Sequence, residues 1–235
     1  MAPYSRYAIY VMPKGPLYDR ASTWLGWDAR RGLVREQPEI GGLPAPTPDL
    51  TATPRRYGFH GTIKPPFRLP EGKTLSGLQD ACAELAAGID AVRVGRLVVQ
   101  PLGGFVAMVP EQPCAPLDAL AAQVVEALDS FRAPPSPEEL ARRRRSGLSD
   151  VQDRLLQRWG YPYVMEEFRF HMTLSGKLDG SDANALAERL DQHFAQVLAE
   201  PFVIDALALV GEAEDGRFHL VADYPLADGS EAGPV

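Results

Sequence analysis

One tripeptide pattern, His-x-Thr, occurs twice in this chain of 235 residues, and each copy opens the same succession of elements. His60-Gly61-Thr62 and His171-Met172-Thr173 lie 111 positions apart, about half the chain. After each copy the hydrophobic pattern predicts a strand, a helix and two further strands. A repeated order of elements at this spacing is typical of a duplication. We therefore expect two similar lobes, each carrying one His-x-Thr strand.

The other predicted elements follow from residue spacing. Period-two patterns rich in β-branched and aromatic residues indicate strands at 5–12, 58–64, 92–99, 105–109, 163–175, 203–210 and 217–222. Apolar residues three and four positions apart indicate helices at 16–32, 74–89, 117–131, 136–145, 149–159 and 182–198. Pro65 and Pro66 are expected to stop the strand that precedes them. We predict a loop at 41–54 and a disordered tail at 228–235, within a single domain spanning 1–235.

Alternation along a strand gives each His-x-Thr segment a polar front and an apolar back. The first front carries His60, Thr62 and Lys64. The second front carries Arg169, His171, Thr173 and Ser175. The residues on the backs are expected to enter the core: Phe59, Ile63, Phe168, Phe170, Met172 and Leu174.

A front of histidine and threonine, present twice, suits the cleavage of a phosphodiester. This reaction needs a base that activates the nucleophile and an acid that protonates the leaving oxygen, and histidine can serve as either near neutral pH. Threonine hydroxyls can donate to the non-bridging oxygens, and Lys64, Arg56 and Arg169 can offset negative charge. Either histidine can be the base. A module that only binds a phosphorylated ligand is the alternative, since binding needs donors but no acid–base pair.

The composition limits the kinds of molecule that this protein is expected to bind and the compartment in which it is expected to work. The formal net charge of −7 argues against coating of long nucleic acid, but it allows a small anionic substrate in a locally basic site. No signal peptide and no run of about 20 apolar residues is present, so we expect a cytoplasmic protein that is not bound to a membrane. Cys82 and Cys114 are expected to be reduced. The histidines and cysteines form no zinc-type cluster, so we expect no metal and no cofactor.

Three further features are weighed against function. The run 142–145, four arginines, is either a solvated helix face, a phosphate or RNA patch, or a lid over the site. His193 is expected at the surface of a helix, and His219 is expected to be structural. Gly103-Gly104 fits a turn better than a phosphate-binding loop.

The two motifs, His60-Gly61-Thr62-Ile63 and His171-Met172-Thr173-Leu174, resemble those of the two-histidine (2H) phosphoesterase superfamily. Three segments, RYAIYVMP, PRRYGFHGTIKPPFRL and WGYPYVMEEFRFHMTLSG, resemble one branch of it, the DUF1045 proteins associated with phosphonate-utilisation gene clusters. The resemblance covers 6–176 and implies a bilobal α+β fold with antiparallel sheets lining a central cleft.

The resemblance also implies residue roles and substrates. His60 and His171 would be the acid and the base, Thr62 and Thr173 would bind phosphate, and no metal would take part. The implied substrate is a small cyclic phosphodiester of a ribose or nucleotide, in phosphonate catabolism; RNA ends with 2′,3′-cyclic or 2′-5′ linkages are the alternative. The family-like segments add candidates for substrate contact: Tyr7, Tyr10, Arg55, Arg56 and Tyr57. No obligate protein partner is expected.

Overall fold

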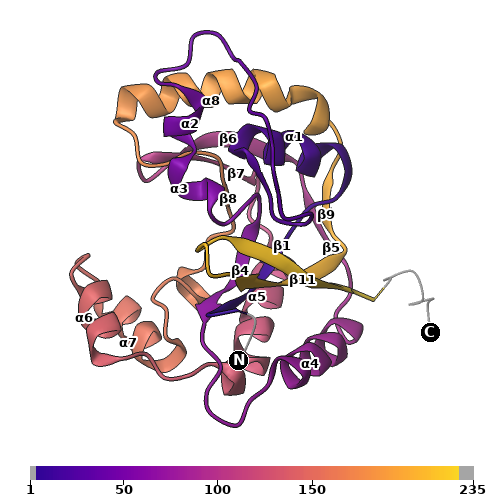
Figure 1. The fold of residues 1–235 in the computed structure, drawn as a ribbon, viewed down its shortest axis with the longest axis vertical. Coiled ribbons are helices and arrows are strands. Elements are labelled where there is room, and N and C mark those ends of the chain that lie inside the picture. The colour runs from indigo at the N-terminus through magenta and orange to yellow at the C-terminus, as the bar shows by residue number, and fades with distance from the viewer. Residues whose placement is uncertain (1–3, 228–235) are drawn as a thin grey trace.

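A seven-stranded sheet runs through the middle of the computed structural model, which describes residues 4–227 (Figure 1). Every pair of neighbouring strands is antiparallel. In spatial order the strands are β11 (Phe218–Pro225), β10 (Ala206–Glu212), β1 (Tyr7–Val11), β4 (Gly61–Phe67), β8 (Met172–Thr173), β7 (Phe105–Pro110) and β6 (Leu97–Leu102). The α+β class and the antiparallel strands are thus as predicted, and the pairing of β4 with β8 joins the strands of the two lobes into one sheet.

The helices of the two repeats exchange places on this sheet. Helix α4 (Leu75–Ala87) follows the first motif, but it packs against β10 and β11 of the second repeat. Helix α8 (Gly180–Phe194) follows the second motif and packs against β6 and β7 of the first. Helix α5 (Ala115–Ala127) covers β4. Each lobe therefore buries apolar residues from both halves of the chain, which ties the halves together in one core.

Two of the predicted strands break at equivalent places. The segment 92–99 divides into β5 (Val92–Gly95) and β6, and the segment 203–210 divides into β9 (Phe202–Ile204) and β10. Strands β5 and β9 pair with each other in a separate two-stranded sheet, while β6 and β10 join the main sheet. The same division in both repeats supports the duplication expected from the sequence.

A glycine sets the end of the first helix. Helix α1 (Gly15–Leu25) ends at Gly26, whose φ of 79° is left-handed, so it is shorter than predicted. The short strands β2 (Trp27–Asp28) and β3 (Leu33–Val34) follow it. The predicted loop 41–54 contains two one-turn helices, α2 (Thr47–Leu50) and α3 (Ala52–Arg55).

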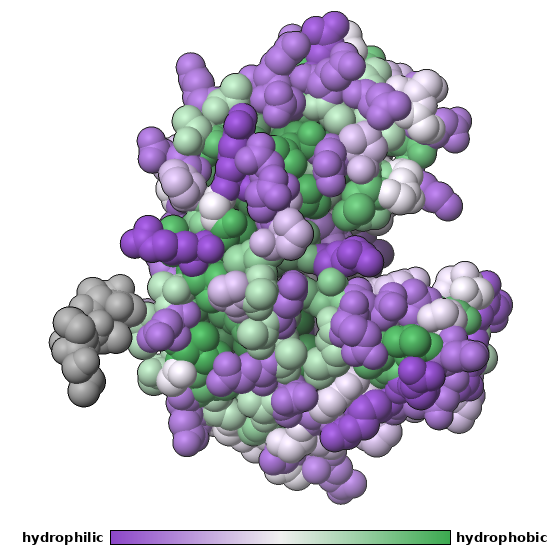
Figure 2. All heavy atoms as spheres, turned by 180° about the vertical axis from the view of Figure 1, so that it is seen from behind, coloured by the Kyte–Doolittle hydropathy of each residue, from purple (hydrophilic) through white to green (hydrophobic). Residues whose placement is uncertain are grey.

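Helices α6 (Pro137–Arg144) and α7 (Asp150–Trp159) stand to one side of the lower lobe (Figure 1). Each begins with a capping box, Ser136 with Glu139 and Ser149 with Gln152, as the sequence indicates for the first of them. From behind, the outline of the molecule is indented between the upper lobe and this pair of helices (Figure 2).

Two strand predictions are corrected. The long strand predicted at 163–175 is mostly absent: Met165 takes a left-handed φ of 53°, a single turn follows at Met165–Glu167, and only β8 joins the sheet. The strand at 58–64 does not stop at the prolines but runs to Phe67, since the pairing with β1 is irregular where Pro65 and Pro66 lie. Proline lacks a donor and is tolerated where a ladder is interrupted.

Within 4–227, no helix has the length and apolar character needed to cross a bilayer. The tail prediction for 228–235 lies outside the described residues.

Candidate active site

The two His-x-Thr motifs meet at the centre of the sheet. Gly61 of β4 pairs with Met172 of β8 in an antiparallel register. Continuing this register by one residue each way places His60 opposite Thr173 and Thr62 opposite His171. Residues directly opposite in an antiparallel pair share a face, with Cβ atoms about 5 Å apart. Two histidines and two threonines therefore form a crossed set on one face of the sheet.

The hydrogen bonds of His60 define its neutral form. Its Nδ1 lies 2.9 Å from the carbonyl oxygen of Gly58, and a carbonyl oxygen only accepts, so Nδ1 carries the hydrogen. The Nε2 atom then holds a lone pair and accepts from the hydroxyl of Thr62 at 3.1 Å. The first motif thus contains a ready proton acceptor held by its own threonine.

His171 is held in the same way. Its Nδ1 donates to the carbonyl oxygen of Arg169 at 2.7 Å, again two residues upstream. This leaves Nε2 as the atom that can exchange a proton with a substrate. The ring of Phe105 lies beside it, with centroids 5.7 Å apart. Both motifs therefore fix the imidazole through backbone and present the same nitrogen.

An aromatic wall encloses His60. Tyr10 is buried and stacks on the imidazole, with ring centroids 3.7 Å apart. Tyr57 lies 6.2 Å from the same ring and stacks on Phe218 at 5.3 Å. Burial lowers the pKa of His60 to about 4; the bond to Gly58 opposes this, and the nearby His171 adds to it. His60 is consequently neutral at physiological pH.

Lys64 does not share the face of His60 and Thr62, which corrects the expectation from alternation. Thr62 pairs with Tyr10, but Lys64 pairs with Ile9, so β4 holds one extra residue and its side-chain direction reverses there. The Lys64 ammonium is buried and donates to the carbonyl oxygen of Val125 at 3.0 Å. Burial lowers its pKa to about 8. Lys64 is therefore part of the packing between β4 and α5, on the opposite face of the sheet from the two histidines.

Tyr7 also lies on the back of the sheet. It is three positions from Tyr10 along a regular pairing with β10, and an odd separation places two residues on opposite faces. The side chain is buried and its ring packs edge-on against Tyr4. Tyr7 and Lys64 are therefore left out of the site proposed below.

The two arginines expected at the site are both exposed. Arg169 lies two residues before His171 and accepts the imidazole hydrogen with its backbone oxygen. Arg56 accepts a backbone hydrogen bond from Phe218, and its guanidinium approaches Gly216. Arg55 is bound elsewhere, to Leu25, Gln37 and Thr51. The contact of Arg56 and Arg169 with phosphate stays a prediction.

The other two histidines lie among aromatic side chains. His193 is half-buried rather than on the surface, with Trp24 and Phe194 beside it, and burial lowers its pKa. His219 packs edge-on against Trp27 at 5.1 Å, as expected of a structural residue. The aromatic rings that pack against His193 and His219 are those of Trp24, Phe194 and Trp27, and none of these residues belongs to a His-x-Thr motif. Cys82 and Cys114 are free thiols.

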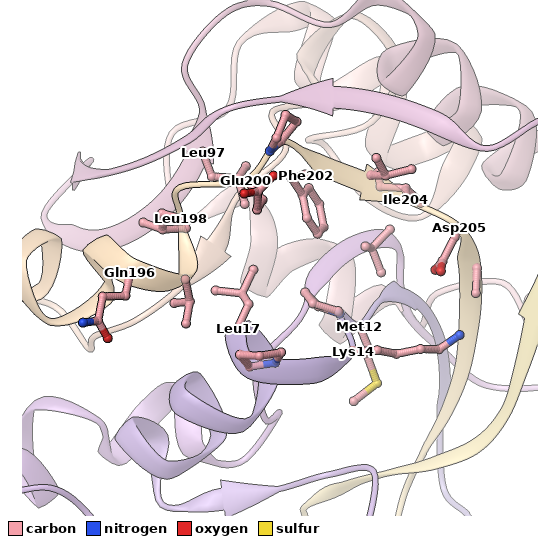
Figure 3. Close-up of a pocket in the computed structure, with 17 residues that line it drawn as sticks. Met12, Lys14, Leu17, Leu97, Gln196, Leu198, Glu200, Phe202, Ile204 and Asp205 are labelled. Carbon is pink, nitrogen blue, oxygen red and sulfur yellow. The ribbon is translucent and has the colours of Figure 1, made fainter.

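A pocket of about 370 Å³ lies apart from this chemistry (Figure 3). It is formed by the end of β1, the start of α1 and the chain around β9, and Leu17, Leu198 and Phe202 are among the side chains that line it. Neither histidine of the motifs belongs to it. Elsewhere in the described part of the chain, no three His, Cys, Asp or Glu residues are grouped as a metal site would require.

The aromatic residues were the part of the site that the motifs did not specify. The sequence offers Tyr10 and Tyr57 only as candidates for substrate contact within the family-like segments, and it places Phe218 in a predicted hairpin. One signal was available for Tyr10: it lies in the first predicted strand, whose even positions share a face. Which strand pairs with β4 could not be read from that pattern.

The comparisons with known proteins confirm the family that the sequence motifs indicate. The family DUF1045, described as "Protein of unknown function", matches residues 62–219. The chain therefore belongs to the DUF1045 family. Two curated relatives, each named "Ribose 1,5-bisphosphate phosphokinase PhnN", come from Janthinobacterium sp. (strain Marseille) and Laribacter hongkongensis (strain HLHK9).

The first relative is 40% identical over 219 residues, which cover 90% of this chain and 48% of the relative. The second is 35% identical over 213 residues, covering 90% and 49%. This chain spans about half the length of these relatives.

Two solved structures are also similar in outline. A crystal structure of a phosphoesterase aligns at TM-score 0.44 and 15% identity, covering 96% of this chain and 99% of its own. Escherichia coli LigT complexed with 3′-AMP aligns at TM-score 0.43 and 14% identity, with the same coverage. These values are low, and membership of the family rests on the sequence matches.

Proposed function

We propose that this protein is a phosphodiesterase that hydrolyses a small cyclic phosphodiester of a ribose or nucleotide by acid–base catalysis with His60 and His171. The observation that carries the proposal is the crossed set, in which Gly61 pairs with Met172 and brings both histidines and both threonines to one face. This set offers two proton-exchanging nitrogens and two hydroxyl donors around one point. A phosphate that accepts from both threonines would have a histidine on each side.

The roles follow from the state of His60. Because its pKa is about 4, it starts neutral, and Nε2 can take a proton from water. The water oxygen bonds to phosphorus while the bond to one ring oxygen breaks. His171, protonated, gives its proton from Nε2 to that oxygen. The net reaction adds one water and yields a phosphomonoester, after which a proton returns from His60 to His171 through solvent.

Thr62 and Thr173 stabilise the charge that develops on phosphorus. In the free protein the hydroxyl of Thr62 donates to His60. When a phosphate enters, we expect it to turn toward a non-bridging oxygen and release Nε2 for the water. Arg56 and Arg169 add positive charge at the rim of the site.

The names of the curated relatives support a ribose substrate. Both relatives are named for ribose 1,5-bisphosphate, and about half of each corresponds to this chain. Hydrolysis of a cyclic phosphodiester on ribose leaves a ribose phosphomonoester, the same class of compound. The name PhnN also fits the association with phosphonate utilisation expected from the resemblance. We place the reaction in that catabolism.

A phosphokinase activity is not assigned to this half of the relatives. A Gly-Lys-Thr sequence does occur between β4 and α4, at Gly72, Lys73 and Thr74. A phosphate-binding loop also needs glycine five positions before Gly72, where this chain has Phe67. Thr74 instead caps α4 by accepting from the amide of Gly77, and the Lys73 ammonium lies 4.4 Å from the ring of Phe131. These side chains stabilise the helix start.

The test is incubation of purified protein with ribose cyclic phosphates, 2′,3′-cyclic nucleotides and 2′-5′-linked oligonucleotides, followed by phosphorus NMR. We expect a phosphomonoester from the first two classes, lost in His60→Ala and His171→Ala. Faster turnover of oligonucleotides would favour RNA-end processing. Protection against melting without turnover of any substrate would show a binding protein and overturn the proposal.

A further inference from the structure

A small hollow near the site is lined by four arginines, Arg6, Arg68, Arg132 and Arg143, and by one carboxylate, Glu139. It lies where β4 runs out past Phe67 and meets the start of α6. Its volume is about 40 Å³. A water needs about 10–15 Å³ measured in this way, so the hollow has room for about three oxygen-sized atoms. That is the size of a phosphoryl group.

Three of the arginines have carboxylate partners within the protein. Arg6 forms two bonds of 2.6 Å to Glu212, Arg68 lies 2.6 Å from Glu139, and Arg132 lies 2.8 Å from Asp129. These pairs hold the guanidinium groups in place.

Arg143 differs from these three. Among the described residues no carboxylate forms an ion pair with it, and its guanidinium lies 4.6 Å from the ring centroid of Tyr161. Two more cations, Lys64 and Arg158, share Asp129 with Arg132. Positive groups thus outnumber negative groups here, although the whole chain carries −7. Such a local excess attracts anions.

Two routes connect the hollow to the histidines. Arg6 directly precedes β1, and its guanidinium lies 6.0 Å from the ring centroid of Phe218. The Phe218 ring lies 5.9 Å from that of Tyr10, which stacks on His60. Arg143 packs on Tyr161, whose pKa is raised by burial and, to a smaller extent, by the nearby Tyr57. Tyr57 in turn lies 6.2 Å from His60. Four residues of extended chain, from Arg6 to Tyr10, span about 13 Å, and the long side chain of Arg6 shortens the gap. A substrate with anionic groups at both ends could reach from one place to the other.

Helix α6 is fixed so that Arg143 faces this hollow. The capping box at Ser136 anchors its start, and Arg68 binds Glu139 in its first turn. At its other end Arg144 forms a pair of bonds with Asp153 of α7. The four consecutive arginines therefore divide by role: Arg144 braces the helices, while Arg142 and Arg145 are exposed.

We propose that this hollow binds a second phosphate of the substrate, with Arg143 as its specificity-determining residue. The inference rests on the proposed function, because it assumes that the first phosphate lies between His60 and His171. The substrate class is then a cyclic phosphodiester of a sugar or nucleoside that carries a further phosphomonoester at its far end.

Two substrates that differ in one group test this. Adenosine 2′,3′-cyclic phosphate is compared with the same compound bearing a 5′-phosphate, at fixed ionic strength. We expect the wild type to prefer the second by kcat/KM. Arg143→Gln should reduce that preference about tenfold to a hundredfold, the scale of one lost charge-assisted hydrogen bond. Arg142→Gln, an exposed neighbour on the same helix, is the matched control and should retain the preference.

The outcomes separate the two proposals. Equal turnover of both compounds, unchanged in Arg143→Gln, overturns the second phosphate site and leaves the hydrolase intact. Turnover of neither compound counts against the proposed function, and the hollow is then tested by binding: ribose 5-phosphate should raise the melting temperature of the wild type and of Arg142→Gln, but not of Arg143→Gln. Equal stabilisation of all three would overturn the inference on its own.

Discussion

Gly61 of β4 lies directly against the ring of Phe170, and a Cβ atom added at Gly61 would be 2.4 Å from that ring. Gly61 is the middle residue of the first motif, and Phe170 immediately precedes the second. Real Cβ atoms do not approach a ring this closely, so the absence of a side chain is what lets the two motif strands pair. The spacing of His60 and His171 thus depends on this contact.

Substitution of Gly61 by alanine should destabilise the fold and disturb the site. Overpacking a buried contact costs about 1–3 kcal/mol, which lowers the melting temperature by about 2–4 °C per kcal/mol in a protein of this size. Thermal unfolding measures the first effect and turnover the second. Gly41→Ala is the control, since nothing lies within 4 Å of a Cβ there. Unchanged melting and activity in Gly61→Ala would show that Phe170 moves aside freely.

Removal of either motif histidine should abolish most turnover while preserving the fold. We expect His60→Ala and His171→Ala each to lower kcat by about two to four orders of magnitude, the usual contribution of a general acid or base. His193→Ala provides the comparison, because that ring is half-buried outside the site. If His193→Ala, still folded by circular dichroism, loses as much activity as His171→Ala, the assignment of the site is wrong.

The threonines should contribute less than the histidines. Thr62→Val and Thr173→Val keep the shape of the side chain but remove the hydroxyl, and each should cost about 1–3 kcal/mol in kcat/KM. Thr→Ser at the same positions retains a hydroxyl and should restore most of the rate. Two valine variants as active as the wild type would remove the threonines from the site.

The motif pattern predicted the two histidines and two threonines, because alternation needs only local sequence. It failed at Lys64, since the extra residue in β4 depends on how β1 pairs with it. It failed again at 163–175, where Phe170 and Met172 point inward as a strand would require, but most of the segment has no ladder partner. A period-two pattern indicates that a segment is extended. Whether another strand forms hydrogen bonds with that segment depends on the rest of the fold.

The α+β class and the order of helices were also accessible from the sequence. Capping residues such as Ser136 and Gly160 mark the bounds of α6 and α7 within one or two residues. The exchange of α4 and α8 between repeats was not predictable, because an amphipathic face shows that a helix is covered but not by which strands. The aromatic wall over His60 depends on the same long-range pairing.

Hydrolysis should continue in excess chelator. The proposed mechanism uses histidines as proton carriers, and two histidines alone are fewer ligands than the three that a catalytic zinc ordinarily takes from protein. Rates measured after dialysis against EDTA should match those of the untreated protein. Loss of activity in EDTA that zinc or manganese restores would contradict the acid–base mechanism.

The stack of Tyr10 on His60 leads to a prediction about pH. The ring buries the imidazole, and burial disfavours its charged form, so the pKa of His60 falls to about 4. A base must be neutral to accept a proton. Activity should therefore be lost only as the pH falls through about 4, well below the range expected for an unperturbed histidine near 6.5.

The complete profile of rate against pH should be bell-shaped, because the acid must start protonated while the base starts neutral. His171 as the acid gives the alkaline limb, where its proton is lost. His60→Ala should remove the acidic limb from the residual rate and leave the alkaline one, and His171→Ala should do the reverse. The two apparent pKa values belong to a coupled pair, so each variant also shifts the limb that remains. If His60→Ala instead removed the alkaline limb and His171→Ala the acidic one, His60 would be the acid and His171 the base. A rate that climbs steadily to pH 10 would instead indicate attack by hydroxide, and the two-histidine mechanism would have to be abandoned.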